Sequence, residues 1–391
     1  MENQYLMNTY SRYDIVFEKG KGSYLYDING TAYLDFVSGI AVNSLGHCNQ
    51  IVVDAIARES QKLMHISNLY WNENQFVLSK MLAQSSGLEK VFFANSGTEA
   101  NEGAMKLARL YGKSTGNNFK NIILYMSNSF HGRSLGSLSI TGQEKYQAPF
   151  RPLFPMTDEV VFNDLASLRE KMNENVCGIF IEPIQGEGGV TPANQEFLNE
   201  ARSLCDKYDS LLIFDEVQCG NGRTGSLFAY EQYHVKPDVL TLAKGLGSGF
   251  PIGAIVAGPK ACDVFQPGDH GSTFGGNPLA CGVAISVLSK ISEKEFLADI
   301  QLKNKFVIER FQSIKIKVPC IKEIRGMGLL LGIEFCESAK TIIQKCFENK
   351  LLLIGAGENV IRIIPALTIS MTELATGLDI LEKAILEVYP S

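Results

Sequence analysis

The chain has 391 residues, of which 45% are hydrophobic and 20% are charged. This is the composition of a globular protein rather than a disordered one, and the length calls for two domains or one large domain with an appendage. The net charge of −6 gives no general attraction to nucleic acid or to anionic membranes.

The start of the chain, its apolar runs and its cysteines indicate the cellular compartment. The start, MENQYLMNTY, contains an early acid and no apolar core, and no apolar run approaches membrane-spanning length, so we expect a cytoplasmic protein. The nine cysteines include no C-x-x-C pair. We therefore expect reduced thiols, no disulfide framework and no metal site.

The predicted elements begin with a hairpin, in which GSYLYD and TAYLDFV flank the turn ING. From about residue 90, short apolar runs alternate with helical stretches. The runs are KVFFA, NIILYM, VCGIFIEP, SLLIFDEV, VLTLAKG and AIVAG. Near-continuous apolar runs are typical of a mostly parallel sheet that helices cover on both faces. One such helix is predicted around 197–208, where Phe197, Ala201, Leu204, Cys205 and Tyr208 share a face.

The pattern changes after Asn277, where a helix leads into two apolar segments and a last helix from about Thr372. The sequence thus predicts an α/β fold with a large domain over 46–276 and a small α+β domain over 277–391. The segment 1–45 is expected to pack with the small domain. Because open α/β sheets bind ligands at the carboxyl ends of their strands, polar residues just after the apolar runs are the candidates for a site.

The first candidate is NSGTEAN (95–101), where Ser96 and Glu99 match an S-x-x-E capping box. It is either only a well-capped helix or a helix start at which Gly97 and Thr98 bind a phosphate. The second candidate is Asp215, which ends an apolar strand. It is a loop cap, a metal-binding acid of an ATPase, or a carboxylate that keeps a cofactor ring nitrogen protonated.

The third candidate, Lys244, follows a buried-looking strand and precedes three glycines. Most lysines in loops are simply solvated, but small residues beside this one leave room for a ligand, and a desolvated lysine forms Schiff bases readily. A phosphate cradle, an acid for a pyridine nitrogen and such a lysine are together what pyridoxal phosphate requires. Asp215 and Lys244 follow successive strands, so we expect both at one sheet edge.

Three other motifs are matched only in part. GRSLG (132–136) fits the G-x-S-x-G elbow of serine hydrolases, but that elbow needs a helix directly after it and SLSITG does not read as helical. GNGRTGS (220–226) has serine where a P-loop requires lysine. GLGSGF and GMGLLL lack the last glycine of the dinucleotide fingerprint.

Over nearly its whole length the chain resembles the class III pyridoxal-phosphate aminotransferases of fold type I. The segments that carry the resemblance are SGIAVNSLGH (38–47), FFANSGTEANEGAMKLAR (92–109), FHGRSLGSLSITGQEKY (130–146), IEPIQGEGGV (181–190), FDEVQCGNGRTG (214–225), LAKGLGSGFPIGA (242–254), HGSTFGGNPLA (270–280) and NVIRIIPAL (359–367).

The resemblance implies roles for individual residues around the cofactor. Lys244 would form the Schiff base, and Asp215 would pair with the pyridine nitrogen. The other cofactor-binding residues it implies are Gly97 and Thr98 at the phosphate, Phe130 and Val217 on the two ring faces, Glu216, and Gln218 at the ring hydroxyl. Thr273 would bind the phosphate of a neighbouring subunit, which requires a homodimer with shared active sites.

The resemblance also implies the substrate contacts. Arg133 would bind a substrate carboxylate, Ser272 would touch the acylated amino acid, and Arg362 would bind the α-carboxylate of glutamate. Glu187 would pair with Arg362 when no α-carboxylate is bound. The implied reaction moves the ω-amino group of N2-acetyl-L-ornithine to 2-oxoglutarate, as in arginine biosynthesis, with Lys244 as general base and acid.

Two other hypotheses stay open at this point. One is a sister transaminase for ornithine, succinylornithine, N-succinyl-diaminopimelate or 4-aminobutyrate. Ornithine aminotransferases tend to carry an aromatic residue near the position of Ile40. Ile40 therefore favours the acetylated substrate, but it also fits 4-aminobutyrate. The other is a serine hydrolase, an ATPase or a non-catalytic α/β protein built on the three partly matched motifs. The family pattern is broken at Asn49-Gln50 and at Ala366, away from the proposed chemistry.

Overall fold

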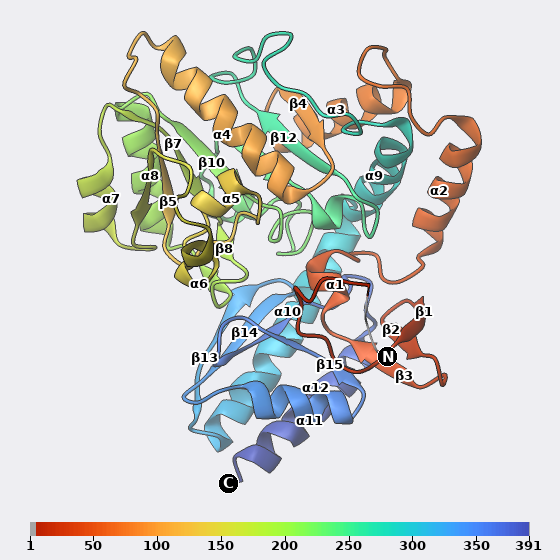
Figure 1. Ribbon diagram of the computed structural model, residues 1–391. Coiled ribbons are helices and arrows are strands. Elements are labelled where there is room, and N and C mark those ends of the chain that lie inside the picture. The colour runs from red at the N-terminus through yellow and green to blue at the C-terminus, as the bar shows by residue number, and fades with distance from the viewer. Residues whose placement is uncertain (1–4, 391) are drawn as a thin grey trace.

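The structure is a computed structural model that describes residues 5–390. Figure 1 shows a large domain built around one sheet and a smaller domain beneath it, which the N-terminal strands flank. The large sheet has seven strands, in the spatial order β4 (Lys90–Ala94), β12 (Gly253–Ala257), β11 (Val239–Leu242), β10 (Leu211–Asp215), β7 (Val176–Ile181), β5 (Ile122–Met126) and β6 (Thr157–Val160).

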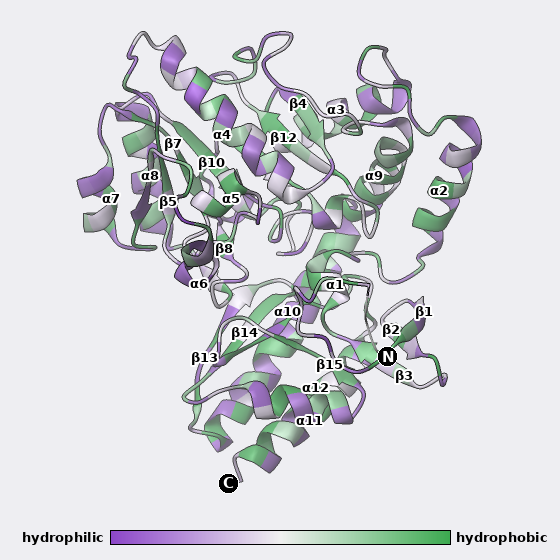
Figure 2. Cartoon of the chain, viewed as in Figure 1, coloured by the Kyte–Doolittle hydropathy of each residue, from purple (hydrophilic) through white to green (hydrophobic). Residues whose placement is uncertain are grey.

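Helices cover both faces of this sheet, which explains the continuous apolar runs of its strands. Along β10, Leu211 and Ile213 join the cluster around α4 (Gly97–Ser114), whereas Leu212 and Phe214 join the opposite cluster. That second cluster includes α7 (Leu165–Lys171) and α8 (Gln195–Lys207). Figure 2 shows the central strands as mainly hydrophobic and α4 as mixed. A strand buried on both faces loses the alternation that marks a half-exposed strand.

The mostly parallel α/β sheet is confirmed, and all six apolar runs are strands. Only β12 runs against its neighbours β11 and β4. The sequence did not reveal β6, because three of its four residues (TDEV) are polar, as an edge strand allows. The helix predicted around 197–208 is α8.

A third group of helices packs at the β4 end of the large domain. It consists of α2 (Gln50–Lys62), α3 (Glu73–Ser86) and α9 (Pro278–Ile291). The apolar residues of α9, from Leu279 to Ile291, belong to the large-domain core. We therefore place the domain boundary after α9 rather than at residue 277.

The small domain then begins with the long helix α10 (Lys294–Lys317) and contains a four-stranded antiparallel sheet. The strands are β13 (Ile321–Met327), β14 (Leu330–Phe335), β17 (Val360–Ile363) and β16 (Ile354–Gly355), and the remaining helices are α11 (Lys340–Glu348) and α12 (Met371–Val388). A pairing of β14 with β17 sets Gly332 opposite Arg362.

The N-terminal hairpin pairs with the small domain through its third strand. Its strands are β1 (Phe17–Lys21), β2 (Tyr24–Asp27) and β3 (Ala32–Asp35), and β3 pairs in parallel with β15 (Leu351–Leu352). The short turn α1 (Ser38–Ala41) follows, and all four of its residues have left-handed φ values. Short elements complete the fold: α5 (Leu135–Ser139), α6 (Glu144–Gln147), β8 (Ile184–Gln185), β9 (Thr191–Pro192), and the 3₁₀ turns η1 (Ala148–Phe150), η2 (Ala229–Tyr233) and η3 (Lys244–Leu246).

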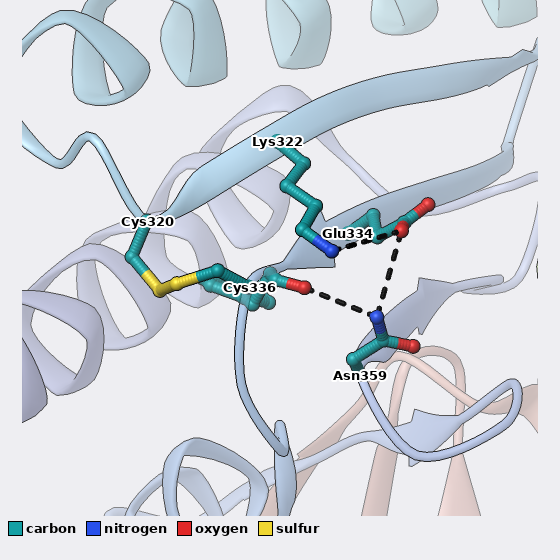
Figure 3. The surroundings of a disulfide bond; sticks show 6 residues. Cys320, Lys322, Glu334, Cys336 and Asn359 are labelled. Atoms are coloured by element: carbon teal, nitrogen blue, oxygen red, sulfur yellow. Dashed lines mark hydrogen bonds and ion pairs between the residues drawn. A yellow bond between two sulfur atoms is a disulfide. The ribbon is translucent and has the colours of Figure 1, made fainter.

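One disulfide, between Cys320 and Cys336, corrects the expectation that all thiols are reduced. Figure 3 shows the bond at the open end of the β13–β14 hairpin. The register explains the contact: Ile321 pairs with Phe335, so the residue before one strand meets the residue after the other. The other seven cysteines are free. Among residues 5–390, no helix is long and apolar enough to cross a membrane.

Candidate active site

A cavity of about 420 Å³ lies at the carboxyl ends of β10 and β11. It brings together eight of the predicted site residues, which are Gly97, Thr98, Phe130, Arg133, Asp215, Val217, Gln218 and Lys244. The position is the one expected for a ligand of an open α/β sheet. Val42, which directly follows the left-handed turn α1, also lines the cavity, whereas Ile40 does not.

The start of α4 forms one end of the cavity. The Ser96 hydroxyl accepts a hydrogen bond from the Glu99 backbone N–H, which is one half of the predicted capping box. The other half is absent, because the Glu99 carboxylate accepts from the backbone and side chain of Asn95 instead. Gly97 is close to Val217: a Cβ at Gly97 would lie 2.7 Å from Val217 Cγ1. A residue larger than glycine therefore does not fit at position 97. The backbone N–H groups at this helix start are available to bind an anion.

Asp215 is buried at the end of β10 and is held by three hydrogen bonds. Its Oδ2 accepts from Nδ1 of His131 at 2.7 Å and from Nδ2 of Asn101 at 2.7 Å, and its Oδ1 accepts from the backbone N–H of Val217 at 2.9 Å. Asn101 Oδ1 in turn accepts from the hydroxyl of Thr241, which lies beside Asp215 in the sheet. The carboxylate is thus fixed in orientation on both oxygens.

His131 and Asn101 are site residues that the sequence did not reveal. Burial lowers the pKa of His131, but the hydrogen bond and charge of Asp215 outweigh it, so the pKa lies above its ordinary value. Its Nε2 is buried and has no hydrogen-bond partner among residues 5–390. The sequence could have indicated His131 only through its position between Phe130 and Arg133 in FHGR. Its contact with Asp215 arises from the fold.

Glu182, which follows β7, is a second buried acid in the cavity wall. Its carboxylate accepts a hydrogen bond from the backbone N–H of Phe130 at 2.9 Å. Burial, and to a lesser degree the charge of Asp215, raises its pKa to about 7, against the opposing charge of His131. Glu182 therefore holds the loop that carries Phe130 to the sheet.

Lys244 follows the end of β11 after one residue, Ala243, and lines the cavity. Its φ of 44° lies in the left-handed region, which is strained for any residue with a Cβ. Strained residues of this kind cluster at functional sites. The side chain makes no hydrogen bond or ion pair with any other described residue. Burial lowers its pKa, and the charge of Arg362 acts in the same direction against the charge of Glu187. Its amine is therefore free and more easily deprotonated than that of an exposed lysine.

Arg362 and Glu187 form the predicted ion pair beside the cavity. Arg362 is fully buried on β17, and its Nη1 donates to Glu187 Oε1 at 2.7 Å and to Gln218 Oε1 at 2.9 Å. Burial alone would raise the pKa of Glu187, but the charge and hydrogen bond of Arg362 hold it below its ordinary value. Nε and Nη2 of Arg362 have no hydrogen-bond partner within the described part of the chain. This guanidinium can therefore donate further hydrogen bonds to a ligand.

Three predicted residues lie elsewhere in a single chain. The buried carboxylate of Glu216 accepts from the backbone N–H groups of Ala229 and Tyr230. This side chain therefore stabilises the start of η2 and does not line the cavity, and its predicted contact with the cofactor stays a prediction. Ser272 lines a separate cavity of about 520 Å³. Thr273 is exposed, and its predicted contact with a neighbouring subunit stays a prediction.

The three partly matched motifs do not assemble a site. A helix, α5, does follow Ser134, contrary to the expectation from SLSITG. However, the Ser134 hydroxyl lies within hydrogen-bond distance of Thr98 Oγ1 and of a Glu102 carboxylate oxygen, and His131 is bound to Asp215. A serine nucleophile needs a base within hydrogen-bond reach, and no histidine contacts Ser134 in the described chain.

The donor set of the cavity fits pyridoxal phosphate. Gly97 provides the space and the α4 N-terminus the N–H groups that would hold a phosphate, Asp215 has a carboxylate that would pair with a ring nitrogen, and Lys244 has an unpaired amine. Phe130 and Val217 are half-buried in the same cavity and offer apolar surfaces to a ring.

Comparisons with known proteins identify the family of the chain. The family model described as aminotransferase class-III matches residues 5–385. Acetylornithine aminotransferase from Clostridium acetobutylicum is 51% identical over 98% of this chain and 100% of its own length. The structure of N-acetylornithine aminotransferase from Stenotrophomonas maltophilia K279a has a TM-score of 0.85 and 37% identity, covering 96% of this chain and 97% of that one. Ornithine aminotransferase from Toxoplasma gondii, whose active site holds PLP at partial occupancy, has a TM-score of 0.93 and 33% identity, covering 98% and 93%.

Proposed function

Because the chain belongs to the class-III aminotransferase family, we propose that it transfers the ω-amino group of N2-acetyl-L-ornithine to 2-oxoglutarate with pyridoxal phosphate as cofactor. The observation that carries the proposal is the cavity that joins the free amine of Lys244 to Asp215, with the Arg362–Glu187 pair beside it. The products are N-acetyl-L-glutamate 5-semialdehyde and L-glutamate, which is a step of arginine biosynthesis.

Pyridoxal phosphate, when bound, supplies an aldehyde that takes up an amino group and a ring that withdraws electrons from the neighbouring carbon. The residues of this chain do the rest. The α4 N-terminus would bind the phosphate, and Asp215, fixed by His131 and Asn101, would supply negative charge to the ring nitrogen. Nζ of Lys244, with its pKa lowered by burial, accepts and returns a proton at the reacting carbon.

The Arg362–Glu187 pair supports the use of two different substrates in one site. With acetylornithine bound through its ω-amine, no α-carboxylate is present at the reacting carbon, and Glu187 neutralises Arg362. With glutamate bound, its α-carboxylate replaces Glu187 at the guanidinium. Room for the displaced side chain exists, because Glu187 also lines a polar cavity of about 660 Å³.

The charges near Arg133 favour an acylated substrate over free ornithine. Arg133 and Lys145 make no hydrogen bond or ion pair with any acid in the described part of the chain. The α-ammonium of ornithine would therefore lie near two cationic side chains with no acid of the described chain beside them to pair with it, whereas an acetamide is neutral. Like charges placed together in a binding site cost several kcal/mol.

A homodimer is part of the proposal, since Ser272 and Thr273 do not line the Lys244 cavity of their own chain. The cavity that Ser272 lines is flanked by exposed apolar side chains, which are Leu69, Tyr70, Trp71 and Phe76. Contiguous exposed apolar surface marks an interface. We propose that the partner subunit covers this surface and that Thr273 reaches the phosphate across it.

The test of the proposed substrate is a comparison of kcat/KM for N-acetylornithine, ornithine and 4-aminobutyrate, each with 2-oxoglutarate. We expect N-acetylornithine to exceed ornithine by about 10²-fold, because of the repulsion described above. The comparison uses one preparation of holoenzyme, so differences in cofactor loading cancel. A preference for ornithine or 4-aminobutyrate would assign the chain to a sister transaminase.

Replacing Arg362 should separate the two half-reactions. In Arg362→Ala we expect kcat/KM for glutamate to fall by about 10²- to 10³-fold, since a buried charged partner of the α-carboxylate is lost. The half-reaction with N-acetylornithine should change by less than about tenfold. Single-turnover absorbance measurements on each half give both values. Arg310→Ala, whose partners lie on α12, is the control. Equal losses in both halves would contradict the exchange of Glu187 for the α-carboxylate.

A further inference from the structure

Arg133 is held by an aromatic ring rather than by an acid. Its guanidinium carbon lies 3.8 Å from the centroid of the Tyr146 ring and 5.5 Å from that of Phe130. The two rings meet edge to face, with centroids 6.0 Å apart and planes at 80°. Arg133 is exposed at the cavity wall and makes no side-chain hydrogen bond with other described residues.

Both aromatic residues are themselves fixed to the site. Phe130 donates its backbone N–H to the buried Glu182 carboxylate at 2.9 Å. Tyr146 lies on α6, and its neighbour Gln147 is buried and donates to the carbonyls of Leu138 and Thr141. The ring of Tyr146 is therefore a stable surface, although α6 is short.

A stacked arginine keeps its hydrogen-bonding capacity for a ligand. The ring contacts the face of the guanidinium, whereas the five N–H donors lie in its plane. An acidic partner would instead occupy two of those donors and cancel the charge. Without any partner, an exposed arginine samples many rotamers and loses entropy when it binds.

We propose that Tyr146 is a positioning residue, which fixes the plane of Arg133 so that its N–H groups are preorganised for the carboxylate of the substrate. This rests on the proposed function, because it takes Arg133 as the carboxylate-binding residue. The interaction needs the ring and not the hydroxyl, since the Tyr146 hydroxyl has no hydrogen-bond partner within residues 5–390. Tyr146 thereby sets selectivity for substrates that carry a carboxylate at this end.

The experiment measures binding of glutarate, a non-reactive dicarboxylate, to the holoenzyme through the change in cofactor absorbance. In Tyr146→Leu we expect Kd for glutarate to rise about tenfold, the size of a partly desolvated cation–π contact and its orientation. Tyr146→Phe should bind within about twofold of the unchanged enzyme. In steady-state kinetics, Tyr146→Leu should raise KM for N-acetylornithine with little change in kcat. Transamination of a diamine without a carboxylate should be unaffected.

Two results would overturn the inference. One is a Tyr146→Leu enzyme that binds glutarate as tightly as the unchanged enzyme. The other is a Tyr146→Phe enzyme as weak as Tyr146→Leu, which would assign the effect to the hydroxyl or to folding of α6. Arg133→Ala separates the inference from the proposed function: if Arg133→Ala also binds glutarate normally, the carboxylate site itself is elsewhere. If only Tyr146→Leu is normal, the site stands and Tyr146 does not position it.

Discussion

Replacing Lys244 by alanine should lower kcat by about 10⁴-fold or more, the largest loss that a single substitution produces here. The change removes both the amine that holds the cofactor and the base that moves the proton at the reacting carbon. Lys244 is the one lysine in the wall of the cavity, so no other described lysine side chain is placed to take its role. Stopped-flow absorbance of each half-reaction measures the loss with added cofactor.

Two controls make the Lys244→Ala result specific. Lys236→Ala removes an exposed lysine that contacts the carbonyl of Gly87 and should leave kcat unchanged. Added methylamine should restore part of the activity of Lys244→Ala, because a small amine can enter the vacated space and act as the base. Full turnover by Lys244→Ala without any amine would refute the assigned role.

The second large effect is expected for Asp215→Asn, which keeps the shape of the side chain and removes its charge. We expect kcat to fall by about 10³-fold, the upper range for losing a preorganised electrostatic partner. Asp215 is also what holds the pKa of His131 above its ordinary value, because burial alone acts in the opposite direction. In Asp215→Asn the pKa of His131 should therefore fall, which NMR of the five histidines can follow.

The control for Asp215→Asn is Asp238→Asn, at another aspartate that holds the sheet together. Asp238 accepts hydrogen bonds from Arg202 and from the backbone N–H of Leu212, outside the cavity. This variant should lose stability in urea while its kcat stays within about threefold. If Asp215→Asn behaved in the same way, Asp215 would be only a structural acid.

Much of the fold was predictable because burial leaves a local signature. The runs that became β7 and β10 carry no charged residue except Asp215 at the end of β10, as expected of strands covered on both faces. By contrast, the sequence analysis assigned α9 to the small domain, whereas its apolar residues belong to the large-domain core. Its apolar face fits either neighbour, and only packing against α2 and α3 decides. The Cys320–Cys336 bond was likewise hidden, because it depends on the register of a hairpin rather than on cysteine spacing.

The candidate site was predictable where a charged residue stands at the end of an apolar run. Lys244 and Asp215 follow successive strands, and parallel pairing of β10 with β11 brings those strand ends together, as predicted. The network of His131 and Asn101 was not predictable, since these residues come from different elements and meet only at Asp215. Glu216, which follows Asp215 in the chain, turns its carboxylate away from the cavity. Successive residues in extended chain point in opposite directions, and Glu216 points to η2.

The most direct test of the central claim, that Lys244 carries the cofactor of an aminotransferase, is borohydride reduction of the enzyme followed by peptide mass spectrometry. We predict that a phosphopyridoxyl group is fixed on the peptide containing Lys244. Incubation with N-acetylornithine before reduction should remove that label, because the amino donor releases the lysine. A label on another lysine, or an unlabelled protein after treatment with pyridoxal phosphate, would contradict the claim.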